Sequence, residues 1–146
     1  MTSSSFSRRG DIASFLAMDV MREANQLQQT GQNICHLEVG QPSTKAPQVV
    51  LDAARYSIDS ELIGYTNALG IDDLRQALSA YYHKTYKVDV APERFVITTG
   101  SSAGFILAFL ACLDAGQKVA VTAPGYPAYT NIIQSLDLTP VTIALG

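Results

Sequence analysis

Small and hydroxylated residues, Gly100-Ser101-Ser102-Ala103-Gly104, separate two strongly apolar segments of the chain. Residues 95–99 before them are β-branched or aromatic without polar alternation, which predicts a buried parallel strand. Residues 105–113 after them are apolar nearly all round and predict a buried helix. Backbone N–H groups and hydroxyls at a helix start favour an anion, so Gly100, Ser101 and Ser102 form a candidate phosphate site. A simple N-cap role for either serine explains the same residues equally well.

The same run also matches the nucleophile elbow G-x-S-x-G, which would make Ser102 the nucleophile of an α/β-hydrolase. That chemistry needs a later acid and a later histidine, whereas His36 and His83 both precede the serine. A hydrolase would therefore have to be truncated. The dinucleotide fingerprint and the P-loop fail on glycine spacing, which disfavours both nucleotide-binding loops.

Composition limits the classes of partner. The chain has 146 residues, 47% of them hydrophobic, which suits about one domain with a core. A net charge of −3 without a basic cluster argues against nucleic acid or an anionic membrane as partner. No apolar run reaches the length of a membrane span. Two cysteines, Cys35 and Cys112, are too few for a disulfide framework, so we expect a reducing, cytoplasmic location, and His36 has no second ligand at metal spacing.

Helical and strand patterns alternate along the chain, which predicts an α/β fold with right-handed crossover connections. Apolar residues at helical spacing predict helices at residues 11–29, 47–59, 102–113 and 128–136, and another that starts at residue 72. Short β-branched runs predict strands at residues 34–39, 95–99, 118–122 and 140–145.

Four segments in a fixed order carry a family resemblance: Leu37-Glu38-Val39-Gly40-Gln41-Pro42; Gly64-Tyr65 with Gly70 and Leu74-Arg75; Ile97-Thr98-Thr99-Gly100-Ser101-Ser102-Ala103; and Ala123-Pro124-Gly125-Tyr126-Pro127. Together they resemble the amino-terminal part of class I/II aminotransferases, pyridoxal-phosphate enzymes of fold type I, over roughly residues 30–146. The resemblance implies an incomplete three-layer α/β/α large domain. Residues 1–45 would then be an arm, a helix and a first strand contributing to the small domain, and residues 46–146 the first part of the cofactor-binding large domain.

The resemblance also implies a role for each motif. Gly100, Ser101 and Ser102 would hold the phosphate of pyridoxal 5'-phosphate, in agreement with the anion argument, and Tyr126 would stack on its pyridine ring. Tyr65 would reach the cofactor phosphate of the neighbouring subunit in a homodimer, and Gly40 would lie near the substrate carboxylate. A cis peptide at Ala123-Pro124 would aim Tyr126 at the ring.

The chain departs from the family pattern in one respect. The family's cofactor-binding lysine, pyridine-nitrogen aspartate and carboxylate-binding arginine would all lie beyond residue 146, and the lysines present occupy loops or element ends. We therefore expect an inactive amino-terminal fragment, with no catalytic residue of its own, of an enzyme that moves an amino group between an amino acid and a 2-oxo acid. Another pyridoxal-phosphate reaction, the truncated hydrolase, and a non-catalytic phosphate-binding or dimerisation module are the alternatives. The sequence does not predict which amino acid is the substrate.

Overall fold

The computed structural model describes residues 7–146 and divides the chain into two compact units. One unit contains the residues up to Glu38 together with Thr98–Gly146, and the other is Val39–Ile97. The elements of the first unit are η1 (Arg8–Gly10), α1 (Leu16–Gln29), α4 (Ser101–Cys112), β1 (Lys118–Ala123), α5 (Ala128–Ser135) and β2 (Thr139–Ala144). Those of the second are α2 (Gln48–Ser60), α3 (Asp72–Tyr86) and η2 (Pro92–Arg94).

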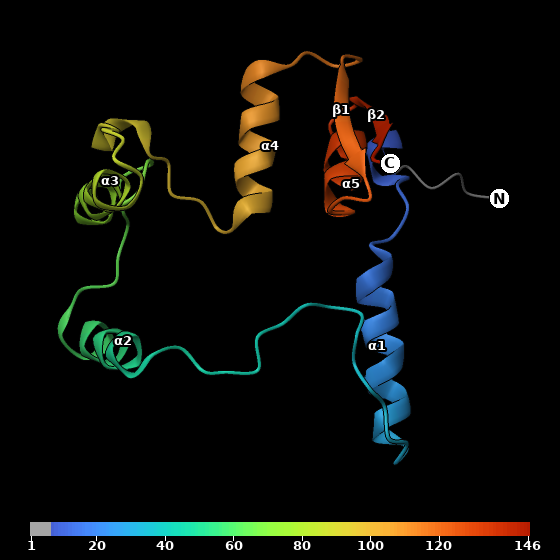
Figure 1. Cartoon of the computed structure of the whole chain (residues 1–146), viewed down its shortest axis with the longest axis horizontal. Coiled ribbons are helices and arrows are strands. Elements are labelled where there is room, and N and C mark those ends of the chain that lie inside the picture. The colour runs from blue at the N-terminus through green and yellow to red at the C-terminus, as the bar shows by residue number, and fades with distance from the viewer. Residues whose placement is uncertain (1–6) are drawn as a thin grey trace. The chain divides into compact units, whose positions relative to one another are not determined.

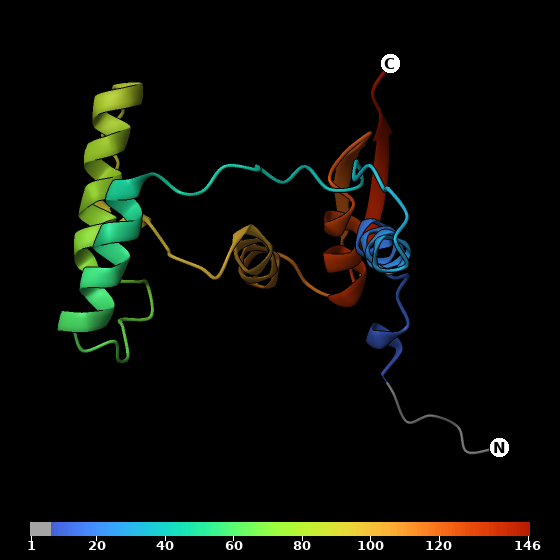
Figure 2. The ribbon, with the colours of Figure 1, turned by 90° about the horizontal axis from the view of Figure 1, so that it is seen from below.

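The centre of the first unit is a β1–α5–β2 arrangement (Figure 1). The two strands pair in parallel, from Lys118 opposite Thr139 to Ala123 opposite Ala144, and a parallel pair requires such a crossover. Helix α5 packs on both strands, as Figure 2 shows from below. Ile133 of α5 is fully buried and Leu138 is 6% exposed, and these two side chains are the buried apolar core of residues 7–146. The sheet and α5 therefore support each other through very few side chains.

Helix α4 is apolar nearly all round, as predicted, and it packs against α5. The predicted burial is not observed, because Leu107 and Leu110 are 53% and 61% exposed. Within the described residues only α5 covers α4, so most of its apolar surface faces solvent. In the same part of the chain, no helix is both long enough and apolar enough to cross a membrane.

Two predicted strands do not form. Residues 34–39 and 95–99 have no strand pairing, and β1 and β2 are the only paired strands among residues 7–146. A strand needs a neighbouring strand to hydrogen-bond its backbone groups. In these two segments, backbone N–H and carbonyl groups are bonded to turns and loops instead. The Ile97 N–H donates to the Leu69 carbonyl at 3.0 Å, and the Gln41 N–H to the Val39 carbonyl at 3.0 Å. The α/β class is confirmed, and the expected three layers are seen only as this mixed, partial arrangement.

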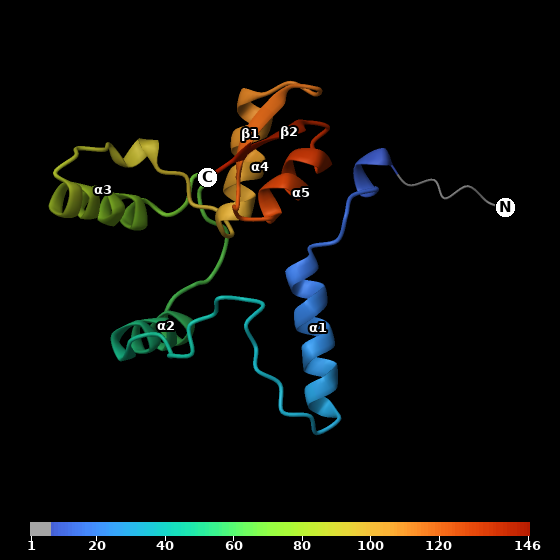
Figure 3. The same ribbon diagram turned by 45° about the vertical axis from the view of Figure 1, so that its right-hand side comes forward.

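In the second unit the chain returns over α3 through η2, and these two elements contact each other (Figure 3). Ser79 donates to the Val90 carbonyl at 2.6 Å, and Tyr82 contacts Phe95 edge-on at 5.3 Å between ring centroids. Gly70, with φ +99°, lies against Ile97 so closely that an added Cβ would be 2.7 Å from the Ile97 Cβ. Only glycine satisfies both the backbone angle and this approach.

Candidate functional site

The start of α4 has the geometry of an anion site. Gly100 is its N-cap residue with φ 90° and ψ 167°, a conformation that is essentially restricted to glycine. An added Cβ would meet nothing within 4 Å, so the backbone angle and not crowding requires glycine here. No side chain of the described residues caps this helix end, and Ser101 and Ser102 are both exposed. The N–H groups of the first turn and two hydroxyls are therefore available to one ligand, and they suit a phosphate group.

A threonine that the sequence did not single out shapes the turn. The Thr98 hydroxyl donates to the Gly100 carbonyl at 2.8 Å, and the Gly100 N–H donates to the Thr98 carbonyl at 2.8 Å. Gly104, one turn along α4, lies beside the same hydroxyl, since its added Cβ would be 3.5 Å from Thr98 Oγ1. A hydroxyl residue two positions before the glycine was the available signal, because such side chains often bond nearby backbone in turns.

Tyr126 follows β1 in a turn with the predicted cis peptide at Ala123-Pro124. The residue is 49% exposed, and its ring contacts Tyr129 of α5 edge-on, with 5.2 Å between centroids and 79° between planes. The Tyr129 ring in turn contacts the ring of Phe105, in the first turns of α4, with 4.6 Å between ring centroids. Within the first unit, these ring contacts thus connect the candidate stacking ring with α4, the helix whose start is the candidate phosphate site.

Gly125 positions Tyr126 in a way that its sequence context did not reveal. A Cβ on Gly125 would overlap the Thr122 carbonyl group, with its carbon at 3.3 Å, and would lie 3.2 Å from Thr122 Oγ1. The turn can approach the end of β1 this closely only because residue 125 has no side chain. Turn composition predicted a bend at this place but not the contact that fixes it.

Gly40 and Tyr65 belong to the second unit, Val39–Ile97, and their predicted roles remain predictions. Tyr65 is fully exposed, in the loop between α2 and α3, where it lines a depression of about 540 Å³ with Ser57 and Asn67. Gly40 is also exposed, and an added Cβ there would meet nothing within 4 Å. The four lysines are exposed as well: Lys45, Lys84, Lys87 and Lys118.

His36, for which the sequence offers no second metal ligand, links the end of α1 to the segment after it. Its Nδ1 lies 2.7 Å from Glu38 Oε1, and its Nε2 lies 3.1 Å from Gln28 Oε1. The hydrogen bond from His36 lowers the pKa of the Glu38 carboxyl below its usual value of 4.5. No group of three or more metal-ligating side chains occurs among residues 7–146.

Comparisons with known proteins give the family. The sequence profile of aminotransferase class I and II matches residues 32–146. Valine–pyruvate aminotransferase of Mycobacterium tuberculosis is 45% identical over 138 residues, 94% of this chain and 36% of the relative. A (5-formylfuran-3-yl)methyl phosphate transaminase of Methanocaldococcus jannaschii is 36% identical over 128 residues, 88% of this chain and 35% of the relative.

Solved structures agree with these relatives. The crystal structure of an aminotransferase from Mycobacterium tuberculosis superposes with a TM-score of 0.93 at 43% identity, over 99% of this chain and 37% of that one. The chain thus spans little more than a third of the length of the relatives that it matches. The match decides against the hydrolase alternative, because it covers the turn and the helix around Ser102 together with the residues before them. The chain belongs to the class I and II aminotransferases, a family that depends on pyridoxal phosphate.

Proposed function

We propose that the protein carrying this chain is an aminotransferase that uses pyridoxal 5'-phosphate to move an amino group between an amino acid and a 2-oxo acid. The observation that carries the proposal is the start of α4, where Gly100 has a glycine-only backbone and no side chain of the described part of the chain caps the helix. Such an opening leaves donors without partners and offers no carboxylate, which suits a phosphate dianion. The cofactor, when bound, supplies the electron sink for the reaction, and the protein supplies binding and orientation.

The residues of this chain would bind and orient and would not transfer protons. The N–H groups and hydroxyls of Ser101 and Ser102 would hold the phosphate, with the α4 dipole adding to the attraction. Tyr126 would present its ring face to the pyridine ring. Gly40 would leave room for the substrate carboxylate, and Tyr65 would donate to the cofactor phosphate of a second subunit in a homodimer.

The division of the chain between domains is part of the proposal. Residues 1–45 would contribute to a small domain, and residues 46–146 would form the first part of the large domain. The relative from Mycobacterium tuberculosis, 45% identical over 94% of this chain, makes valine and pyruvate the first substrate pair to assay.

The phosphate site is tested by removing both hydroxyls, Ser101→Ala with Ser102→Ala, in the protein that carries this chain. Loss of hydrogen bonds to a charged group, each about 1.5 to 3 kcal/mol, predicts at least tenfold weaker binding of pyridoxal 5'-phosphate. Pyridoxal without the phosphate should bind both proteins equally. Ser135→Ala is a matched control, because that hydroxyl lies outside the proposed phosphate site and donates to the Ile132 carbonyl of its own helix, α5, at 2.8 Å.

Two results would contradict the proposal. One is equal cofactor affinity of the double variant and the wild type, measured by absorbance titration. The other is stoichiometric labelling of Ser102 by a fluorophosphonate, which would restore the hydrolase reading of the G-x-S-x-G run.

A further inference from the structure

Phe15 occupies an unusual position at the start of α1. It is the N-cap residue, since the Met18 N–H donates to its carbonyl at 2.9 Å, and no side chain among residues 7–146 caps this helix end. Ser, Thr, Asp and Asn are preferred there because their side chains bond the free N–H groups. The Phe15 ring instead contacts the Tyr126 ring edge-on, with 6.0 Å between centroids and 80° between planes. Phe15 therefore does not cap the helix with its side chain, and its ring packs on Tyr126, the candidate stacking ring.

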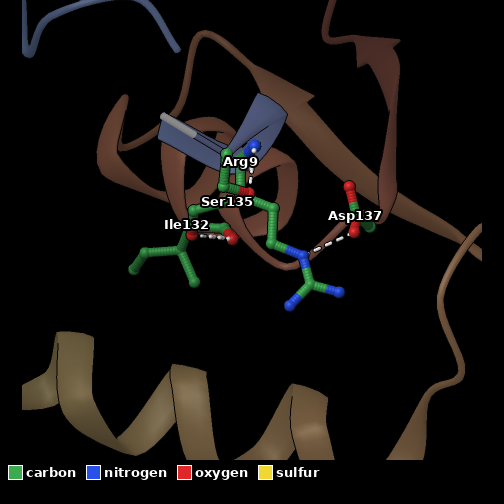
Figure 4. A network of polar contacts seen from close by, with 5 residues as sticks. Arg9, Ile132, Ser135 and Asp137 are labelled. Carbon is green, nitrogen blue, oxygen red and sulfur yellow. Dashed lines mark hydrogen bonds and ion pairs between the residues drawn. The ribbon is translucent and has the colours of Figure 1, made fainter. Parts of the chain in front are cut away.

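The segment that carries Phe15, Arg9–Phe15, is fixed to α5 and to the turn after it; we call it the strap. Asn131 of α5 donates from Nδ2 to the Ala13 carbonyl at 2.7 Å. Arg9 reaches from η1 to Asp137, with 2.5 Å between Nε and Oδ2 (Figure 4). Both ties lie within the first unit. The place of Phe15 is therefore set by the element that also carries Tyr129.

Tyr126 is held by two rings at nearly right angles to its own. The interplanar angles are 80° with Phe15 and 79° with Tyr129. Edge-to-face pairs are favourable in defined orientations, so two of them restrict the ring more than burial alone would. About half of the Tyr126 surface remains exposed and is available to a further ring.

We propose that Phe15 is a positioning residue, which holds the Tyr126 ring in the orientation that stacks on the pyridine ring of the cofactor. This inference rests on the proposed function. Phe15 itself is not assigned any contact with the cofactor. It acts through Tyr126, and the strap acts through Phe15.

The test compares Phe15→Ala, Phe15→Leu and Phe15→Tyr in the protein that carries this chain. Loss of one edge-to-face pair predicts about 2- to 10-fold weaker binding of pyridoxal 5'-phosphate for Phe15→Ala. The circular dichroism of the bound cofactor band should fall as well, because the ring it stacks on is less ordered. Phe15→Tyr should restore both values, whereas Phe15→Leu, which keeps bulk without a ring, should not.

Two further variants separate positioning from general stability. Asn131→Ala loses the hydrogen bond to the Ala13 carbonyl but removes no ring, so it should loosen the strap and shift the cofactor band in the same direction by a smaller amount. Leu16→Ala removes the neighbouring apolar side chain, which is 71% exposed, and should leave the band unchanged. If Phe15→Ala fails to fold, Phe15→Leu and Asn131→Ala still decide the question.

The inference is overturned if Phe15→Leu and Asn131→Ala keep the wild-type cofactor affinity and an unchanged cofactor band. It is also overturned if Phe15→Tyr does not restore the affinity and the band. Absence of any cofactor binding by the wild type is a different failure and contradicts the proposed function. The ring resonances of Tyr126 in the free protein then decide what Phe15 does. If ring flipping is no faster in Phe15→Leu than in the wild type, Phe15 does not hold the ring.

Discussion

Replacing the two glycines that flank Ser101 and Ser102 should have opposite effects on stability. Gly100 has φ 90° and ψ 167°, so Gly100→Ala places an alanine in a glycine-only region. Such strain costs about 1 to 3 kcal/mol. The smaller entropy of the unfolded alanine chain offsets about 0.4 to 1 kcal/mol of this. A net destabilisation of roughly 1 to 2 kcal/mol follows from these two terms.

Gly104 lies inside α4, and its added Cβ would make an ordinary contact, 3.5 Å from Thr98 Oγ1. Gly104→Ala should therefore stabilise the protein by roughly 0.5 to 1 kcal/mol, the usual gain of alanine over glycine in a helix. Each variant adds one methyl group, at one or the other end of residues 100–104. Their unfolding free energies should be separated by about 2 kcal/mol, more than a tenfold difference in the folding equilibrium.

Urea unfolding followed by far-UV circular dichroism, at one protein concentration and without cofactor, measures this difference through the midpoints. Cofactor titration adds a second readout. An alanine at residue 100 must relax by turning the peptide that leads into the α4 N–H groups, so Gly100→Ala should also bind pyridoxal 5'-phosphate at least tenfold more weakly. Gly104→Ala should bind as the wild type does. Equal midpoints for the two variants, or undiminished cofactor binding by Gly100→Ala, would refute the reasoning.

Two further predictions concern other parts of the chain. Gly70→Ala should destabilise the protein by roughly 2 to 5 kcal/mol, since backbone strain at φ +99° adds to overlap with Ile97. Ile97→Ala in the same chain removes the γ-carbons but keeps the Ile97 Cβ, 2.7 Å from the added Cβ, so urea unfolding should recover only part of the overlap cost. Glu38→Gln should remove a pH dependence. The His36 hydrogen bond lowers the pKa of the Glu38 carboxyl. The contribution of this hydrogen bond to the free energy of unfolding is therefore present above pH 4.5 and is lost as pH falls through the lowered pKa. The stability difference between wild type and Glu38→Gln should thus shrink between about pH 5 and pH 3, and a constant difference would show that the pair contributes nothing.

Helices were predictable from the sequence because their signals are local. Apolar spacing and dipole-compatible charges placed the α3 start at Asp72, and the structure has it there. The strand prediction at residues 95–99 was wrong for a physical reason that composition does not reveal. A β-branched run forms a strand only when another strand pairs with it, and in the described chain the Ile97 N–H bonds a loop carbonyl instead.

The candidate site divides in the same way. Gly100, Ser101 and Ser102 were identifiable because a helix start depends on a few consecutive residues. The supporting role of Phe15 was not, since it depends on a contact with a ring far along the sequence. The hydrogen bond that holds the strap joins Asn131 and Ala13, which are 118 positions apart, and neither residue belongs to a recognisable sequence motif. Apolar spacing placed Phe15 on a helical face, whereas the structure puts it at the helix cap.

The phosphate site and the stacking ring depend on one support. Helix α4 is covered only by α5 in the described chain, and α5 packs on both strands and carries the fully buried side chain of Ile133. Burying such a side chain is worth about 1.5 to 3 kcal/mol, comparable to a charge-assisted hydrogen bond to the phosphate. A change that loosens α5 therefore displaces Tyr129, and through it both Phe105 of α4 and Tyr126. Cofactor binding should thus be as sensitive to the packing of α5 as to the residues that contact the cofactor.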